Sequence, residues 1–203
     1  MYVTNDHAVR AAVSPLLSQL ETFSGAPGGT VVYVDVNAPG AARVVARVPF
    51  ANGVALLNAS HVAVASSSKA GVYLYRIDAG DHGLAFDRLI RTPAGADNLS
   101  VDGNGVLLIA GHPFAPALMG VAHRRAGCDP NGGAEEREAC KCDAPSWVGE
   151  WSEEGGLRTV LVSLGQEEDG KGMCSSSTAV RDVGRGLGMV SMLYGRGVGV
   201  FEV

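Results

Sequence analysis

The stretch ADNLSVDGNGVLLIAG (residues 96–111) shares one plan with FANGVALLNASHVAVAS (residues 50–66). In both, an asparagine precedes a short apolar strand, a polar turn and a second apolar strand that ends in small residues. The two asparagines, Asn52 and Asn98, are 46 residues apart, and Asn5 lies 47 residues before Asn52. A repeat of about 40–50 residues is the size of a four-stranded propeller blade. The repeat therefore predicts an all-β chain built from propeller blades.

Short β-rich runs separated by glycine, asparagine and aspartate turn signals continue this pattern along the chain. We expect strands at residues 29–36, 42–50, 61–66, 71–77, 84–90, 105–111, 186–194 and 197–203. Residues 8–23 are the only convincing helical stretch, and Pro15 interrupts it early. Residues 175–193 read as a further copy of the repeat, delayed by a polar, cysteine-bearing insertion at about residues 121–158. Residues 1–203 are therefore expected to form a single β-propeller domain or a fragment of one.

Composition narrows the function classes. The chain has 203 residues, of which 46% are hydrophobic and 18% charged, which indicates one folded domain and not a disordered chain. A net charge of −5 and few, scattered aromatic residues predict no nucleic-acid partner. No apolar run approaches the roughly 20 residues of a membrane helix, so no membrane-spanning segment is expected. The start, MYVTNDHAVR, lacks a signal-peptide pattern and reads as the interior of a strand, so the chain is either compact from its first residue or the back part of a longer protein.

The repeated asparagines predict a metal site. Equivalent positions of successive propeller blades are related by rotation about a central channel, so Asn5, Asn52 and Asn98 are expected to face one axial space. Asp6 and Asp97 adjoin two of them. Amide and carboxylate oxygens suit Ca²⁺, which takes about 6–8 oxygen ligands, whereas Zn²⁺ prefers cysteine and histidine. The alternative is that these are ordinary turn residues, where asparagine and aspartate are also favoured.

Two asparagines also fit the glycan acceptor pattern. Asn98-Leu99-Ser100 matches it, but an inward ligand cannot also carry a sugar on a wet surface loop. Asn58-Ala59-Ser60 lies in a turn between two expected strands and is the better acceptor if the chain is secreted.

Several stretches occur in the order and at the separations of one known family. They are VTNDH (3–7), FANGV (50–54), ADNLSVD (96–102), GHP (111–113), STAV (177–180) and GVGVFEV (197–203). In these the chain resembles the C-terminal half of the serum paraoxonase/arylesterase family, which are calcium-dependent six-bladed propeller esterases and lactonases. The resemblance implies roughly the last three to three-and-a-half blades of such a propeller.

The resemblance also implies roles for particular residues. It assigns the catalytic calcium to Asn5, Asn52, Asp97 and Asn98, and a second, structural calcium to Asp6. It places His112 in the wall of the substrate pocket as a catalytic residue that positions substrate or assists proton transfer, with a merely structural loop histidine as the alternative. In such enzymes the ion polarises a carbonyl or phosphoryl oxygen while water attacks. The expected function is thus calcium-dependent hydrolysis of a small-molecule ester or lactone.

The chain departs from the family in its first half. A Glu-Asp pair and a histidine dyad of the family have no counterpart before Asn5, and Phe201 stands where the family has a C-terminal cysteine. Two alternatives therefore stay open: an inactive propeller remnant that acts as a binding or interaction module, and a calcium-dependent hydrolase of the gluconolactonase type. A half ring would also leave open sheet edges, through which a homo-oligomer is expected.

The cysteines and His7 complete the candidates. Cys128, Cys140, Cys142 and Cys174 offer a C-x-C pair where zinc sites usually present C-x₂-C, so disulfides are favoured over reduced thiols or a metal site. Disulfides would indicate an oxidising compartment, and the neighbouring EEGG and APSW sequences indicate a solvated loop.

His7 follows Asn5 and Asp6 and is expected either to orient them by hydrogen bonding or to pack.

Overall fold

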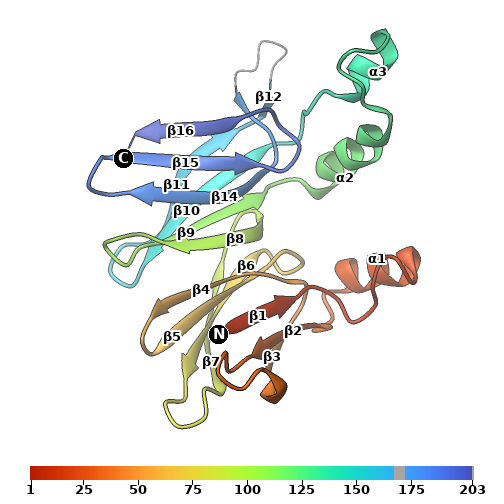
Figure 1. Cartoon of the computed structure of the whole chain (residues 1–203). Helices are drawn as coiled ribbons and strands as arrows, with labels where there is room; N and C mark the ends of the chain where they lie inside the picture. Colours follow the sequence, from red (N-terminus) through yellow and green to blue (C-terminus); the bar gives the residue numbers. More distant parts are fainter. Residues whose placement is uncertain (167–171, 203) are drawn as a thin grey trace. The chain divides into compact units, whose positions relative to one another are not determined.

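The computed structural model describes residues 1–166 and 172–202, so Val203, at the end of an expected strand, lies outside the described residues. The chain divides into two compact units, Met1–Val101 and Asp102–Val203. Figure 1 shows the strands and helices of each unit. No helix in the described residues combines the length and apolar character needed to cross a membrane.

The first unit contains two antiparallel sheets, ordered β1-β2-β3 and β4-β5-β6-β7. The first sheet consists of β1 (Tyr2–Asn5), β2 (Gly29–Tyr33) and β3 (Arg43–Val48). The second consists of β4 (Ala51–Asn58), β5 (His61–Ser66), β6 (Gly71–Ile77) and β7 (Leu84–Arg91). The remaining elements are α1 (Pro15–Ser24), the 3₁₀ turn η1 (Pro39–Ala41) and β8 (Gly95–Val101). Each strand in these sheets pairs with its neighbour in the sequence, which makes both sheets simple meanders.

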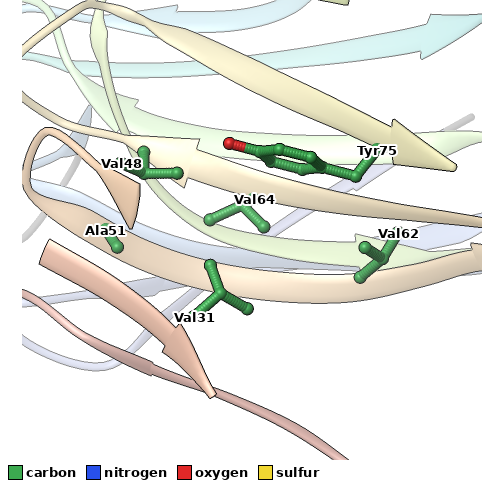
Figure 2. Packing of buried hydrophobic residues seen from close by; sticks show 6 residues of the cluster. All are labelled: Val31, Val48, Ala51, Val62, Val64 and Tyr75. Atoms are coloured by element: carbon green, nitrogen blue, oxygen red, sulfur yellow. The ribbon is translucent and has the colours of Figure 1, made fainter. Parts of the chain in front are cut away.

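The core of the first unit lies between these two sheets. Val31 and Val48 from the first sheet meet side chains from β4, β5 and β6, as Figure 2 shows. Val62 and Val64 on β5 are 0% exposed, and Tyr75 on β6 is 6% exposed. Burial of such side chains is worth about 1.5–3 kcal/mol each, so this contact is the main source of stability in the unit.

The second unit repeats the arrangement. Its sheets are ordered β11-β10-β9 and β14-β15-β16, with a small β12-β13 pair beside them. The strands are β9 (Leu107–His112), β10 (Ser146–Ser152), β11 (Gly156–Ser163), β12 (Gly165–Gln166), β13 (Gly172–Met173), β14 (Ser176–Asp182), β15 (Leu187–Met192) and β16 (Val198–Glu202). The helices are α2 (Ala115–Arg124), the 3₁₀ turn η2 (Arg125–Gly127) and α3 (Ala134–Ala139). Leu108, Ala110 and Val148 pack against Ala179 and Val190 to form the core.

The four cysteines form two disulfides, Cys128–Cys140 and Cys142–Cys174, which confirms the disulfide prediction. The second disulfide is buried beside Val121 of α2. It therefore fastens the helical segment to the start of β14.

The all-β class is confirmed, because antiparallel strands make up most of the regular structure. None of the sheets in the described residues closes on itself, so the propeller remains a prediction, and so does the single domain. The insertion expected at about 121–158 is not a simple solvated loop. It holds α3, and residues 146–152 form β10, the middle strand of its sheet.

The helix expected over residues 8–23 begins later than expected, at Pro15. Proline is tolerated in the first turn of a helix because its missing N–H has no partner there. Ser14 caps this end by accepting a hydrogen bond from the Leu17 N–H. Gly25, in the left-handed conformation at φ 66°, closes the other end.

Candidate metal centre

Asn52 lies in a β-bulge at the start of β4. Ala51 pairs with Ser66 and Val54 pairs with Val64, so Asn52 and Gly53 together oppose a single residue of β5. A bulge interrupts the alternation of the strand and re-aims its side chains. The bulge therefore takes Asn52 out of the regular pattern of β4.

Gly53 brings β4 into direct contact with β8. A Cβ on Gly53 would lie 2.6 Å from Asn98 Cα and 2.8 Å from both the Asp97 carbonyl oxygen and the Leu99 nitrogen. Only a residue without a side chain permits backbones to approach this closely. The bulged Asn52 and the Asp97-Asn98 pair therefore lie on adjoining segments.

Hydrogen bonds join the same segments. The Asn52 amide nitrogen donates to Ser67 Oγ at 3.1 Å, and Ser67 Oγ donates to the Ala96 carbonyl oxygen at 2.8 Å. On β8, the Asn98 amide nitrogen donates to Asp97 Oδ1 at 3.3 Å. Asp97 is 7% exposed and Asn98 is half-buried, an environment more typical of an inward ligand than of a glycan acceptor.

A second glycine, Gly29, lies against both the residue that follows Asn5 and the start of β4. A Cβ on Gly29 would lie 2.7 Å from the Asp6 carbonyl oxygen and 2.6 Å from the Ala51 nitrogen. The residue after Asn5 therefore adjoins the residue before Asn52. The structure thus brings together the backbone segments that carry Asn5, Asn52, Asp97 and Asn98.

The side-chain amide nitrogen of each of the three asparagines is hydrogen-bonded within the first unit. In each, the amide nitrogen is the end that donates to a protein acceptor, which for Asn5 is the His7 carbonyl oxygen at 2.7 Å. Amide and carboxylate oxygens are the ligand types that Ca²⁺ prefers, and the segments that carry them adjoin one another.

Asp6 and His7 form a pair beside this cluster. Asp6 Oδ2 lies 3.2 Å from His7 Nδ1, and the Asp6 side chain is 59% exposed. His7 Nε2 lies 2.6 Å from Thr22 Oγ1, and its ring centroid lies 4.5 Å from that of Phe50. Both interpretations of His7 hold, because it bonds to its neighbours and also packs.

Helix α1 is tied to the same region by residues that the sequence analysis did not single out. The Glu21 carboxylate accepts hydrogen bonds from the Ala8 N–H at 2.8 Å and the Val9 N–H at 3.1 Å. Ser68 Oγ donates to the Thr22 carbonyl oxygen at 2.6 Å. These contacts fix the loop that follows Asn5 and Asp6. No sequence motif marks them, because they join positions 12 to 46 residues apart.

His112 lies in the second unit, at the end of β9, where it is half-buried. Its Nδ1 lies 3.4 Å from Ser175 Oγ. Asn58, the other glycan candidate, is the exposed last residue of β4, and its side chain accepts a hydrogen bond from the Ser60 N–H at 2.9 Å.

The second unit also contains a buried charge cluster that the sequence analysis missed. Arg181 lies 2.6 Å from an oxygen of Asp102 and 2.5 Å from an oxygen of Glu150, and the Asp102 side chain is 0% exposed. Glu150 also pairs with the exposed Arg158, and these two residues line a cavity of about 500 Å³ together with Arg181.

Burial and hydrogen bonding act in opposite directions on these groups. Burial alone would raise the pKa of Asp102, but hydrogen bonds from the Val106 N–H and from Arg181 lower it below its ordinary value. Burial alone would lower the pKa of Arg181, but hydrogen bonds to Glu150 and Asp102 raise it. Both groups therefore stay charged, which is typical of a structural ion-pair cluster and not of an acid or base in catalysis.

Among the described residues, no group of three or more His, Cys, Asp and Glu is placed to hold a metal ion. A cation at the strand ends of the first unit would therefore depend on amide oxygens as well as Asp97. No model of a known protein family matches the chain, and no curated protein sequence matches it.

Proposed function

We propose that the chain is part of a calcium-dependent hydrolase of esters or lactones of the paraoxonase/arylesterase type, built as about half of a six-bladed propeller. The observation that carries the proposal is the close approach at Gly53, which sets Asn52 against Asp97 and Asn98. The four-stranded meander β4–β7 agrees with it, since this is the arrangement of a propeller blade.

Asn5, Asn52, Asp97 and Asn98 would hold the catalytic ion, and Asp6 would bind a second one. When bound, calcium would supply Lewis-acid polarisation of the substrate carbonyl. The chain's own residues contribute position: Ser67 and the His7 carbonyl hold two of the amides, and the bulge sets the angle of Asn52. In the first unit, His7 and Thr22 also fix the loop that presents Asn5 and Asp6.

One carboxylate among four side-chain ligands implies modest affinity, because calcium affinity rises with the negative charge of the ligand set. We expect a dissociation constant of about 0.1–1 mM, the range of weakly charged extracellular sites. The resemblance gives His112 a place in the substrate pocket, and this role is part of the proposal.

The test is hydrolysis of phenyl acetate, a δ-lactone and a sugar lactone, with calcium and with a chelator. Asn52→Ala is compared with Asn58→Ala, since both asparagines lie on β4 and Asn58 is an exposed turn residue. The proposal expects chelator-sensitive activity on phenyl acetate or the δ-lactone that falls at least about 100-fold in Asn52→Ala and stays unchanged in Asn58→Ala.

Equal activity of the two variants, or activity that survives the chelator, would overturn the proposal. Calcium binding without hydrolysis would favour a binding module, and preference for the sugar lactone would favour the gluconolactonase type. The homo-oligomer expected from open sheet edges stays a prediction, and a monomeric mass by light scattering would contradict it.

A further inference from the structure

The residues at the start of β14 are held unusually firmly for a strand end. Cys174 is 0% exposed and is joined to Cys142 by a disulfide. The disulfide packs with Val121 of α2 and with Ala144. The residue that follows Cys174 is thus anchored covalently on one side.

Ser175, the next residue, is fully buried and has a positive φ of 58°. A residue other than glycine adopts this conformation only where its surroundings impose it. Here the Ser175 N–H donates to the Ala144 carbonyl oxygen at 3.1 Å, and its carbonyl oxygen accepts from the Leu193 N–H at 2.8 Å. Its hydroxyl lies 3.4 Å from His112 Nδ1.

Ser176 fixes the other side of the contact. Its hydroxyl lies 2.9 Å from the carbonyl oxygen of Gly111, the residue before His112, and 3.0 Å from that of Trp147. Its N–H donates to Ser146 Oγ at 2.9 Å, and both serines are 0% exposed. The backbone of His112 and the backbone of Ser175 are therefore held in one buried network.

We infer that Ser175 is the positioning residue for the His112 imidazole, and that the Cys142–Cys174 disulfide holds Ser175 in that place. The inference deepens the proposed function, because it concerns the histidine assigned to the substrate pocket. The Ser175 hydroxyl can donate to Nδ1 or accept from it, so the contact orients the imidazole ring in either tautomer. The disulfide and the serine network stabilise a backbone conformation that Ser175 would otherwise leave.

The test is the ¹⁵N spectrum of the histidine rings at pH 9, where an ordinary histidine is neutral. His112→Gln assigns the His112 signals among the five histidines. Ser175→Ala removes the hydroxyl and keeps the backbone strain, whereas Ser175→Gly removes the hydroxyl and relieves the strain. We expect both to shift the Nδ1 signal of His112, because that nitrogen loses its contact with the Ser175 hydroxyl.

The disulfide is tested in the same spectra. The double variant Cys142→Ala/Cys174→Ala is expected to shift the His112 signals, and Cys128→Ala/Cys140→Ala is the matched control that leaves them unchanged. Unchanged His112 signals in both Ser175 variants, or equal shifts in both cysteine variants, would overturn the inference. The spectra need neither calcium nor substrate, so a failure of the hydrolase proposal would be seen separately.

Discussion

Replacing Gly53 by alanine tests the contact that joins the two halves of the candidate metal centre. The new Cβ would lie 2.6–2.8 Å from three backbone atoms of β8, whereas ordinary contacts begin at 3.4 Å. Backbone atoms cannot rotate away as a side-chain tip does, so the segments must separate by roughly 0.8 Å, the difference between 3.4 and 2.6 Å. Overpacking of this kind costs about 3 kcal/mol.

Urea unfolding followed by circular dichroism measures this cost. If the free energy of unfolding falls by about 2 kcal/mol per molar urea, the urea concentration at the unfolding midpoint should fall by about 1.5 M. Calcium affinity, measured by calorimetry on the folded variant, should fall by at least about tenfold, because oxygen ligands must stay about 2.3–2.6 Å from the ion.

Gly40→Ala is the matched control in the same unit, because nothing lies within 4 Å of its added Cβ. This substitution should leave the free energy of unfolding unchanged or raise it by about 0.5 kcal/mol, because alanine lowers the conformational entropy of the unfolded chain. If Gly53→Ala unfolds at the same urea concentration as Gly40→Ala, the close approach of β4 and β8 is refuted.

Three further predictions concern stability and ionisation. Asp102→Asn should destabilise the protein by about 2 kcal/mol at pH 7, because it removes one of the two carboxylate partners of the buried Arg181 and leaves only Glu150 beside it. Since the pKa of Asp102 is lowered on folding, its contribution to the free energy of unfolding is present above about pH 4 and is lost as the pH falls further. The urea midpoints of variant and parent should therefore converge in acid. Midpoints that stay apart would contradict the assignment. Ser14→Ala should cost about 1 kcal/mol by removing the cap of α1, and an unchanged melting temperature would argue against that cap. Burial, with the neighbouring Tyr73 adding to it, raises the pKa of Tyr75 to about 12. An absorbance titration should therefore show one tyrosine ionising near pH 12 that Tyr75→Phe lacks. The free energy of unfolding should fall as the pH rises above about 10, where tyrosine ionises in the unfolded chain.

Strands with clear turn signals were predictable from the sequence, and the reason is visible in β5. HVAVAS contains four consecutive apolar residues, VAVA, and in the structure these are all buried because both faces of β5 are covered. The start of α1 was misplaced because residues 8–14 are also apolar at helical spacing. The proline at position 15 marks a first turn at least as well as an interruption.

Strand β10 escaped prediction because its sequence, SWVGEWS, carries a glutamate in a buried position. Glu150 is tolerated there because Arg158 and Arg181 pair with it, and these residues come 8 and 31 positions later in the chain. A local window cannot register a partner at that distance. The choice of cysteine partners is equally non-local, so the sequence favoured disulfides without indicating the pairing.

The asparagines of the candidate site were found through their repeat spacing, but the feature that joins them was not. No sequence signal distinguishes Gly53 from the other glycines of the chain, although it is the residue that permits β8 to approach Asn52. Ser67, which bonds the Asn52 amide, lies across a hairpin and has no signature of its own. The candidate oxygen donors are therefore readable from the sequence, while the contacts that bring their segments together are not.

The most direct test of the metal centre is a crystal structure of the protein grown with calcium. The account predicts one cation with the side-chain oxygens of Asn52, Asp97 and Asn98 at about 2.3–2.6 Å. A structure with calcium bound only elsewhere, or with these three side chains on separate surfaces, would contradict it.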